Sequence, residues 1–337
     1  MEEQLSLEQR CVELVSELGL GDPSQVTCVE PLSGGVASDV AKVEVGDKRF
    51  CLKFALPKLK VKEDWFAPVK RNRAEYEWLR VAGEVAPTSA LRLFGCSETK
   101  YGFALEFLQG DDVFLWKSAL LDGQQNEGEA EQVGDLLGRI HAASAAPGFD
   151  TSPFLNEEDF HAMRVEPYLL FTASRRPEVA DVLHGLARML TESKTVLVHG
   201  DVSPKNIFFR DTGPVLLDGE CADMGDASFD PAFCLNHLAL KAIHLPASRT
   251  FMFDQFEAFW KAYAVHVNWE DLAALEERVC LLMSAFMLAR IDGKSPVEYL
   301  EPSVQQKVRD LAVSLLTSPV TRVGVLRTTI EEKIKEF

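Results

Sequence analysis

The chain has 337 residues, enough for two packed lobes, and its 47% hydrophobic and 26% charged residues are ordinary proportions for a globular protein. A formal charge of −17 at pH 7 argues against general nucleic-acid binding, which needs a basic surface. The sequence has no run of about 18 apolar residues, no start like a secretory signal and no CxxC pair, so we expect a cytoplasmic protein without a membrane partner.

The first hundred residues predict a helix followed by an antiparallel sheet. Apolar positions recur at helical spacing over 5–18, and glycines end the pattern. Short segments rich in Val and Phe, separated by glycine turns, then predict strands. These lie at 25–32, 38–45, 48–55, 90–96 and 101–107. A single helix at about 66–83 is inserted after the third strand.

Residues 108–112 (LQGDD) have the composition of a hinge, and we expect an N-terminal lobe over 1–108 and a C-terminal lobe over 109–337. The second lobe is predicted to be mostly helical. Its helices are expected at about 127–146, 157–173, 176–193, 230–243, 248–267, 269–292 and 303–317. Short apolar strands interrupt this pattern over 195–218, and an extended insert in a helical lobe is a place to look for chemistry.

The strongest chemical signal is the segment His199-Gly200-Asp201-Val202-Ser203-Pro204-Lys205-Asn206, which follows an apolar strand. Its D-x-x-x-x-N spacing is that of a kinase catalytic loop. A carboxylate at Asp201 orients a hydroxyl and accepts its proton, and the amide oxygen of Asn206 is a suitable Mg²⁺ ligand. The alternative is a structural turn in which His199 bonds to the backbone.

A second acidic segment follows, Leu216-Leu217-Asp218-Gly219-Glu220. Asp218 stands at the end of an apolar strand, where it is placed to bridge Mg²⁺ and the phosphates of ATP. Glu220 is expected to share the metal shell through water. Phosphoryl transfer needs mainly positioning and charge neutralisation, so two or three such ligands are enough.

The third predicted strand carries Lys53, in Phe50-Cys51-Leu52-Lys53-Phe54-Ala55. A kinase needs a cation of this kind at the α- and β-phosphates. Glu75, on the following helix, is the expected partner of Lys53, with Glu77 as a rival on the opposite side of that helix. The alternative is a surface lysine beside a solvated helix face.

The turn Ser33-Gly34-Gly35-Val36-Ala37-Ser38 joins the first two strands. Its glycines would let backbone N–H groups approach phosphates, although a plain hairpin turn has the same composition. Further on, Asp230 precedes Pro231 at the start of an apolar segment. This pattern predicts a helix N-cap at Asp230 that also anchors the catalytic loop.

These residues together resemble the aminoglycoside phosphotransferase and choline kinase superfamily, which carries an H-G-D-x-x-x-x-N loop and a later D-x-E segment. A closer resemblance, from Leu52–Pro57 and from Phe229–Phe233, is to methylthioribose kinases. The chain differs from those kinases at Asn206, where they typically carry serine. They also have a late arginine pair, whereas this chain has isolated arginines such as Arg278 and Arg290.

The resemblance implies an α+β, bilobal protein-kinase-like fold with a five-stranded antiparallel N-lobe, one inserted helix and a mostly helical C-lobe. It implies ATP and Mg²⁺ as cofactors, Asp201 as the catalytic carboxylate, and Asn206, Asp218 and Glu220 as metal ligands. The nucleotide would be held by Lys53, Glu75, Ser33, Gly34, Gly35, Ser38 and the hinge residues Glu106, Phe107 and Leu108.

The sequence favours a small hydroxyl acceptor over a protein. Gly200 stands where protein kinases keep an arginine, and only eleven residues separate Asp218 from Asp230, too few for a peptide-binding loop. Acids such as Asp223, Asp254 and Glu257 are candidates for binding an amine or polyol, and the alternative, favoured for most of them, is a solvated face. A methylthioribose kinase, an antibiotic-resistance kinase and a catalytically silent nucleotide-binding scaffold remain open, as does the oligomeric state.

Overall fold

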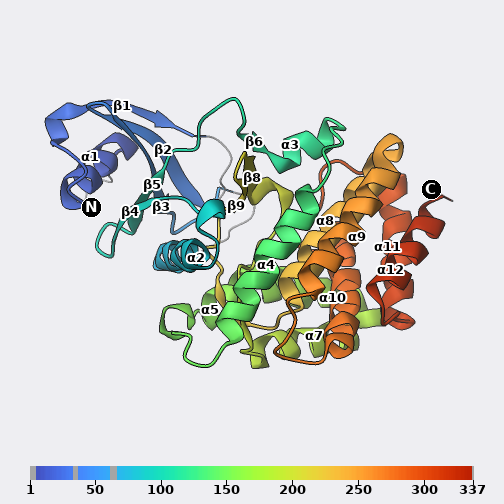
Figure 1. Cartoon of the computed structure of the whole chain (residues 1–337). Helices are drawn as coiled ribbons and strands as arrows, with labels where there is room; N and C mark the ends of the chain where they lie inside the picture. Colours follow the sequence, from blue (N-terminus) through green and yellow to red (C-terminus); the bar gives the residue numbers. More distant parts are fainter. Residues whose placement is uncertain (1–4, 33–36, 61–66, 336–337) are drawn as a thin grey trace.

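The computed structural model describes residues 5–32, 37–60 and 67–335, and these form an antiparallel sheet beside a larger helical body (Figure 1). The sheet has five strands in the order β1-β2-β3-β5-β4. They are β1 Val26–Pro31, β2 Ser38–Val45, β3 Lys48–Ala55, β4 Leu93–Ser97 and β5 Gly102–Glu106. The predicted sheet, with one helix inserted between the third and fourth strands, is confirmed.

Helix α1 (Leu7–Glu17) covers one face of the sheet. Ser6 and Gln9 form a reciprocal capping box at its start, which satisfies N–H groups that the helix leaves unpaired. The buried face of α1, centred on Leu14, joins a core with Phe50 and Phe54 from β3. Burial of these side chains fixes the sheet against its covering helix.

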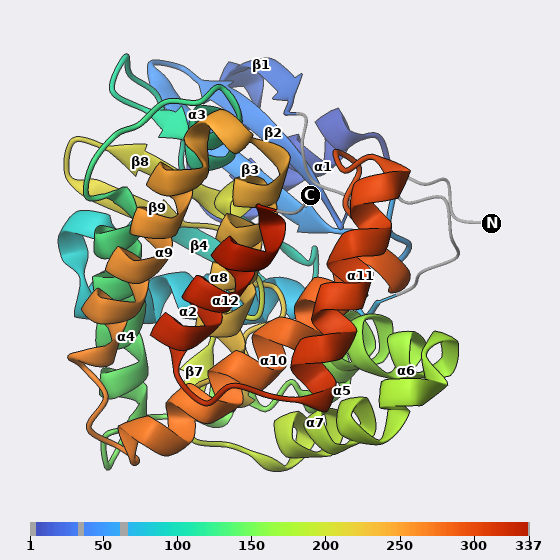
Figure 2. The same ribbon diagram turned by 90° about the vertical axis from the view of Figure 1, so that its right-hand side faces the viewer.

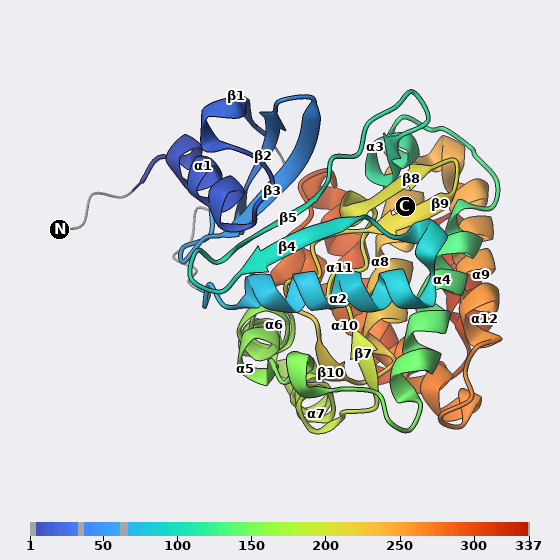
Figure 3. The same ribbon diagram turned by 60° about the vertical axis from the view of Figure 1, so that its left-hand side comes forward.

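Helix α2 (Arg71–Val85) lies between the sheet and the helical body, as Figure 3 shows. The predicted start at 66 is wrong for the described part, because residues 67–70 form a turn that contains Pro68. Trp78 is 1% exposed and packs in the main core, so α2 ties the two parts of the molecule together.

The helical body contains several long helices (Figure 2), of which α8 and α10 have most of their residues buried. Its larger helices are α4 Glu129–Ala145, α7 Ala180–Glu192, α8 Phe229–His244, α9 Arg249–Ala264, α10 Leu272–Asp292, α11 Pro302–Thr317 and α12 Val323–Ile334. A continuous helical stretch comprises α5 Glu157–Phe160, a π-helix His161–Leu170 and α6 Phe171–Arg175. No helix in the described ranges is both long and apolar enough to cross a bilayer.

Short strands interrupt the helices over the predicted segment 195–218. They are β7 Val196–Val198, β8 Ile207–Arg210 and β9 Gly213–Leu216. The sequence did not predict the partner strands β6 Phe114–Leu115 and β10 Asp223–Gly225, or helix α3 Trp116–Leu121. All seven cysteines are free thiols, four of them buried.

The division of the chain into two lobes at residue 108 stays a proposal.

The sheet-bearing part and the helical part are joined by polar contacts as well as by α2. Glu106, at the end of β5, accepts a hydrogen bond from Arg210 Nη1 at 3.2 Å, and Arg210 also donates to the carbonyl of Ala90. These contacts hold the end of β5 and the segment before β4 against Arg210 of β8.

Candidate active site

The catalytic loop leaves β7 through a turn that requires glycine. Gly200 has φ +79°, and a Cβ at this position would lie 2.9 Å from the Cβ of Cys221. Both oxygens of Asp230 accept backbone hydrogen bonds from the loop, from His199 N at 2.7 Å and from Gly200 N at 2.9 Å. Asp230 therefore anchors the loop as predicted. The predicted N-cap at Asp230 is wrong, because the cap is Ser228 and Asp230 lies in the first helical turn.

His199 has the structural role that was the alternative for this motif. Its Nδ1 accepts a hydrogen bond from Asp201 N at 3.1 Å, and its ring packs edge-on against Trp78 with ring centres 4.6 Å apart. Burial lowers the pKa of His199, so the ring is neutral and fixes the direction in which Asp201 leaves the backbone.

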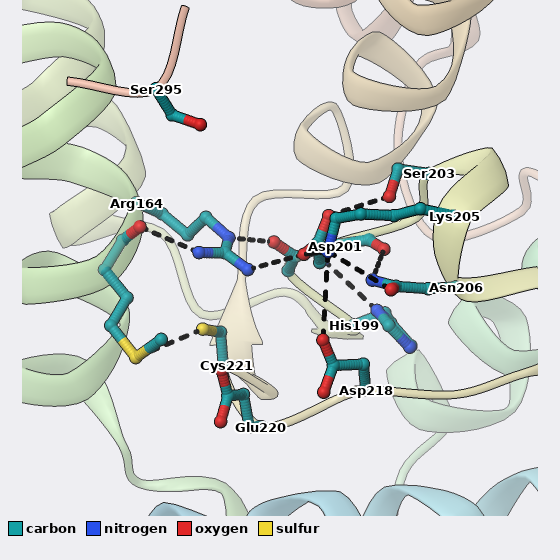
Figure 4. A network of polar contacts seen from close by, with 12 residues as sticks. Arg164, His199, Asp201, Ser203, Lys205, Asn206, Asp218, Glu220, Cys221 and Ser295 are labelled. Carbon is teal, nitrogen blue, oxygen red and sulfur yellow. Dashed lines mark hydrogen bonds and ion pairs between the residues drawn. The ribbon is translucent and has the colours of Figure 1, made fainter. Parts of the chain in front are cut away.

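Asp201 is 6% exposed and lies between two cations (Figure 4). Arg164 Nη2 and Lys205 Nζ approach its Oδ2 at 3.0 Å and 2.9 Å, and Ser203 donates to Oδ1 at 3.0 Å. Burial alone would raise the pKa of Asp201, but Lys205 and Arg164 hold it far below its usual value. The carboxylate is therefore ionised at neutral pH and fixed in direction.

Arg164 was missed by the sequence analysis. It comes from the π-helix and also donates to the carbonyl of Gly200 and, at 2.8 Å, to that of Met163. Nothing in the local sequence marks Arg164, because its role depends on how the π-helix packs against the loop.

The side-chain oxygens of Asn206 and Asp218 favour a cation between them, and the ammonium of Lys205 occupies this place. Lys205 Nζ lies 3.2 Å from Asn206 Oδ1 and 3.8 Å from Asp218 Oδ2. The amide of Asn206 is oriented by its Nδ2, which donates to the Asp201 carbonyl at 3.1 Å. The Lys205 side chain is 45% exposed, so it is free to leave this point for another anion.

Asp218 is held in a backbone conformation that few residues adopt. Its φ is +68°, in the left-handed region that aspartate tolerates better than most residues, and its N–H donates to Glu75 Oε1 at 3.0 Å. Lys53 Nζ lies 2.5 Å from Asp218 Oδ1 and 2.7 Å from Glu75 Oε2. The structure thus brings the lysine strand, the inserted helix and the D-x-E segment to one place.

Glu75 is the partner of Lys53, and the rival Glu77 is not, because Glu77 pairs with Arg80 at 2.8 Å. Burial, opposed by Lys53 but reinforced by Asp218, raises the pKa of Glu75 to about 7. The pKa of Asp218 falls to about 2 because Lys53 and Lys205 outweigh burial. Two carboxylates therefore share one lysine, and the excess negative charge favours a further cation.

Glu220 is held by a side chain that the sequence analysis did not single out. Arg71 is fully buried, and its Nε donates to Glu220 Oε2 at 2.8 Å. Its four remaining N–H groups donate to backbone carbonyls, those of Ala67, Pro68, Ala37 and Leu56. Arg71 thereby links Glu220 to the segments on either side of residues 61–66 and to the end of the 33–38 turn. One Glu220 oxygen is committed to this contact.

The donor set fits Mg²⁺ held by few protein ligands. Among residues 5–32, 37–60 and 67–335, no group of three or more His, Cys, Asp or Glu side chains is arranged to hold a metal. Mg²⁺ at kinase sites uses one or two carboxylates together with substrate phosphates and water. Asp218 and Asn206 match that pattern, and the ammonium of Lys205 already lies between their oxygens.

The predicted nucleotide contacts lie only partly in the described ranges. Ser33, Gly34 and Gly35 fall outside the described residues. Ser38 is buried at the start of β2, opposite Ala55. Within the described residues, the backbones of Phe107 and Leu108 make no hydrogen bond, whereas Glu106 N donates to Arg92 O at 2.8 Å. The contact of this hinge with adenine stays a prediction.

A cavity of about 480 Å³ opens beside Asp201. It lies between the catalytic loop, the π-helix, α8 and the segment after α10. Its lining includes Asp201, Lys205, Asp218, Tyr168, Phe233, His237, Lys241, Arg290 and Tyr299. This volume suits a metabolite-sized ligand next to the Asp201 carboxylate.

The acids that the sequence suggested for amine binding do not line this cavity. Asp223 is buried in β10, where it accepts from Asn156 N at 2.9 Å and pairs with Lys194 at 3.1 Å. Asp254 and Glu257 lie on α9, and Glu257 pairs with Lys261 at 2.7 Å. These candidates therefore do not form an amine or polyol site in this cavity, and Asp254 and Glu257 lie on a solvated face of α9, with side chains 64% and 44% exposed.

Comparisons with known proteins agree with this geometry. A model of the family described as "Phosphotransferase enzyme family" (APH) matches residues 29–275. A methylthioribose kinase from Pectobacterium atrosepticum is 23% identical over 299 residues, which is 78% of this chain and 73% of that protein. One from Yersinia pseudotuberculosis serotype O:3 is 24% identical over 292 residues, covering 75% and 71%.

Solved structures share the fold at low identity. A choline/ethanolamine kinase family protein from Mesorhizobium loti superposes with a TM-score of 0.54 at 14% identity, covering 96% of this chain and 99% of that one. A spectinomycin phosphotransferase in complex with ADP and spectinomycin gives 0.52 at 11% identity, covering 98% and 100%. Together these neighbours bear out the protein-kinase-like fold.

Proposed function

The chain belongs to the phosphotransferase enzyme family (APH), whose related proteins are small-molecule kinases, and we propose that it transfers the γ-phosphoryl group of ATP to a hydroxyl of a small molecule. The observation that carries this proposal is that Lys53 contacts Asp218, at 2.5 Å, beside the cavity that Asp218 and Asp201 line. Lys205 connects the last two, at 3.8 Å and 2.9 Å.

The nucleotide would lie between the sheet and the catalytic loop. Lys53, oriented by Glu75, would bind the α- and β-phosphates once it exchanges its 2.5 Å contact with Asp218 for a phosphate oxygen. The free backbone at Phe107 and Leu108 would accept adenine. The 33–38 turn is retained as part of the proposed phosphate contact.

The metal would be held by Asp218 and Asn206, with Glu220 in support through water. Bound Mg²⁺ supplies charge neutralisation at the transferred phosphoryl group. Because the ammonium of Lys205 lies between the same two oxygens, we expect Lys205 to turn toward the γ-phosphate when the site is loaded. Its charge would then act where negative charge develops.

Asp201 would orient the acceptor hydroxyl and receive its proton. Its depressed pKa makes it a weak base while Lys205 and Arg164 both bind it. Departure of Lys205 toward phosphate removes one of those cations and raises the basicity of Asp201 as the nucleotide binds. Arg164 keeps the carboxylate in position, so it is a positioning residue.

Methylthioribose is a candidate acceptor because the curated relatives are methylthioribose kinases. The late arginine pair expected of such kinases is replaced here by separated residues. Arg278 is committed to Asp226 and Glu270, at 3.1 Å and 2.6 Å, and Arg290 lines the cavity. The acceptor therefore has to be identified by experiment.

Addition of ATP and Mg²⁺ is expected to raise the melting temperature of the wild-type protein. A ligand that binds only the folded state stabilises it by about 2.7 kcal/mol at 100 times its dissociation constant. Lys53→Met should lose most of this shift, because the phosphates lose their main cation. The ligand-induced change is measured for each protein against its own nucleotide-free value.

Lys48→Met is the matched control, because Lys48 is an exposed residue on the same strand. It should keep the full nucleotide-induced shift. A wild-type protein that shows no shift with ATP and Mg²⁺ would favour a scaffold without nucleotide binding and would overturn the proposed function.

A further inference from the structure

One side of the cavity is lined by cations that the protein does not neutralise. Lys117 comes from α3, Lys241 from α8 and Arg290 from α10, and we call these three residues the cation cluster. Lys241 is 2% exposed, and its ammonium makes no hydrogen bond or ion pair to any described residue. A buried ammonium without a partner is costly, so its retention in the cavity wall suggests a ligand.

Arg290 is only partly satisfied by the protein. Its Nη1 donates to the carbonyl and, at 2.8 Å, to the hydroxyl of Ser295, which lies apart from the catalytic loop in Figure 4. Its Nε is buried and has no partner among the described residues. Its Nη2 makes no hydrogen bond to any described residue, so an anion in the cavity could bind Nη2 together with the ammonium of Lys241.

The acids in the cavity wall do not balance this cluster. Asp201, Asp218 and Glu220 are committed to other cations, at 2.9 Å, 2.5 Å and 2.8 Å respectively. The remaining acid that lines the cavity, Glu298, is exposed. Lys117 is exposed as well, so these two opposite charges both face water. The more deeply placed part of the wall, with Lys241 from α8 and Arg290 from α10, presents net positive charge to a ligand, despite the strongly acidic chain.

We propose, on the basis of the kinase function above, that the acceptor carries an anionic group, a carboxylate or a phosphate ester, which Lys241 and Arg290 bind while its hydroxyl faces Asp201. Both groups offer the same chemistry, oxygen anions that accept hydrogen bonds from buried cations. Polyamine acceptors such as aminoglycosides would meet like charge in this wall.

His237 lines the cavity together with the cation cluster and residues of the loop after β7. It lies one helical turn before Lys241 on the same face of α8, and it lines the same cavity as Asp201. Burial, with Lys241 and Arg290, lowers the pKa of His237 well below its usual value. A neutral imidazole there adds no charge and offers a hydrogen bond to the middle of an acceptor.

The direct test compares acidic acceptors with their neutral counterparts. ADP formation with ATP and Mg²⁺ is measured for sugar acids and hydroxy acids, for sugar phosphates, and for the matching sugars and polyols. Acidic members should be accepted and neutral members poorly. The carboxylate and phosphate arms identify which anion the site prefers.

Lys241→Met should raise KM for the acidic acceptor about tenfold or more while kcat changes little, as expected for loss of one charged hydrogen bond in binding. Lys261→Met, an exposed lysine on α9, is the control and should change neither constant. Best activity on neutral or amine acceptors, with KM unaffected by Lys241→Met, would overturn the proposal and leave the kinase function standing.

A binding measurement separates the two proposals. Inorganic phosphate, malonate and D-gluconate are added to the nucleotide-free protein, and the melting temperature is followed. A larger rise for wild type than for Lys241→Met supports the anion site even if no acceptor is phosphorylated. Equal rises in the two proteins would contradict it, because the nucleotide site is intact in both.

The stability of the free protein should also report on Lys241. Burial, Lys117 and Arg290 lower the pKa of Lys241 from 10.5 to about 7. Between these values the unfolded chain binds more protons, so wild-type stability should rise with pH relative to Lys241→Met. The free energy of unfolding of Lys241→Met should exceed that of the wild type by most at pH 7 and below, and this excess should shrink toward pH 10.

Urea unfolding of the wild type and of Lys241→Met between pH 7 and pH 10 measures the difference in their free energies of unfolding. Titrations that the two proteins share cancel in this difference. The groups that act on the charge of Lys241 are Lys117 from α3, Arg290 from α10 and Cys234 from α8. The other titratable or charged groups lining the cavity are His237 from α8, Arg164 and Tyr168 from the π-helix, Asp201 and Lys205 from the loop after β7, Asp218 and Glu220 from the D-x-E segment, and Glu298 and Tyr299 from the segment after α10. A difference that stays constant with pH would mean that the charge of Lys241 is as well stabilised in the folded free protein as in the unfolded chain. That result would contradict an ammonium without a partner.

Discussion

Asp201→Asn is expected to lower kcat by about a thousandfold, in the range in which positioned acid–base groups contribute. The amide keeps the shape of the side chain and its contact with Ser203, at 3.0 Å in the wild type, but it cannot accept the acceptor's proton. It also removes the charge that aligns Lys205 and Arg164. Steady-state ADP formation with a saturating acceptor measures the loss.

Binding of ATP and Mg²⁺ should survive this change, because Lys53 and Asp218 are untouched. The nucleotide-induced rise in melting temperature is the control, and it should stay close to that of the wild type. Retention of more than a tenth of the wild-type kcat by a folded Asp201→Asn protein would remove Asp201 from the reaction.

Arg71→Met is expected to cost about 3–5 kcal/mol of folding free energy, the usual result of leaving one partner of a buried ion pair without the other. Arg71 is fully buried, and its loss strands the Glu220 carboxylate and four backbone carbonyls. Urea unfolding monitored by circular dichroism measures the change.

Arg73→Met is the matched control on the same helix. Arg73 is 56% exposed and pairs with an exposed Glu98, so its loss should change stability by about 0.5 kcal/mol or less. Adding Glu220→Gln to Arg71→Met should recover part of the loss, because no buried charge is then left unpaired. Equal losses for Arg71→Met and Arg73→Met would show that the buried network contributes nothing to stability.

The parts of the site that follow one another closely in the chain were predictable from the sequence. Asp201 and Asn206 share one loop, and Asp218 ends the next strand pair, so their meeting follows from local geometry. Lys53 and Glu75 were predictable because a strand and the helix after it pack together. The structure joins them at 2.7 Å.

Residues that reach the site from distant helices gave no local signal. Arg164 and Arg71 resemble ordinary surface arginines in sequence, and only the packing of the π-helix and α2 buries them at 6% and 0% exposure. The residues that line the acceptor cavity could not be predicted for the same reason. The wall of this cavity is formed largely by α8 and α10, and no sequence motif indicates how these two helices are rotated relative to each other.

Among the helices, α12 was missed because local propensity is weak there. The segment Val323–Ile334 begins Val-Gly-Val and holds two adjacent threonines, all poor helix formers. Its apolar residues Val323, Leu326 and Ile330 are buried, so tertiary packing stabilises a helix that the sequence alone does not favour.

The most direct test of the central claim is transfer of labelled γ-phosphate from ATP to a small-molecule acceptor. The wild-type protein is incubated with Mg²⁺ and a metabolite library, and phosphorylated products are resolved from ATP and free phosphate. We predict a product that carries the label on a hydroxyl, that forms only with Mg²⁺ and that is absent with Asp201→Asn. Labelled product at equal rates from wild type and Asp201→Asn, or none from any acceptor while ATP fails to bind, would contradict the account.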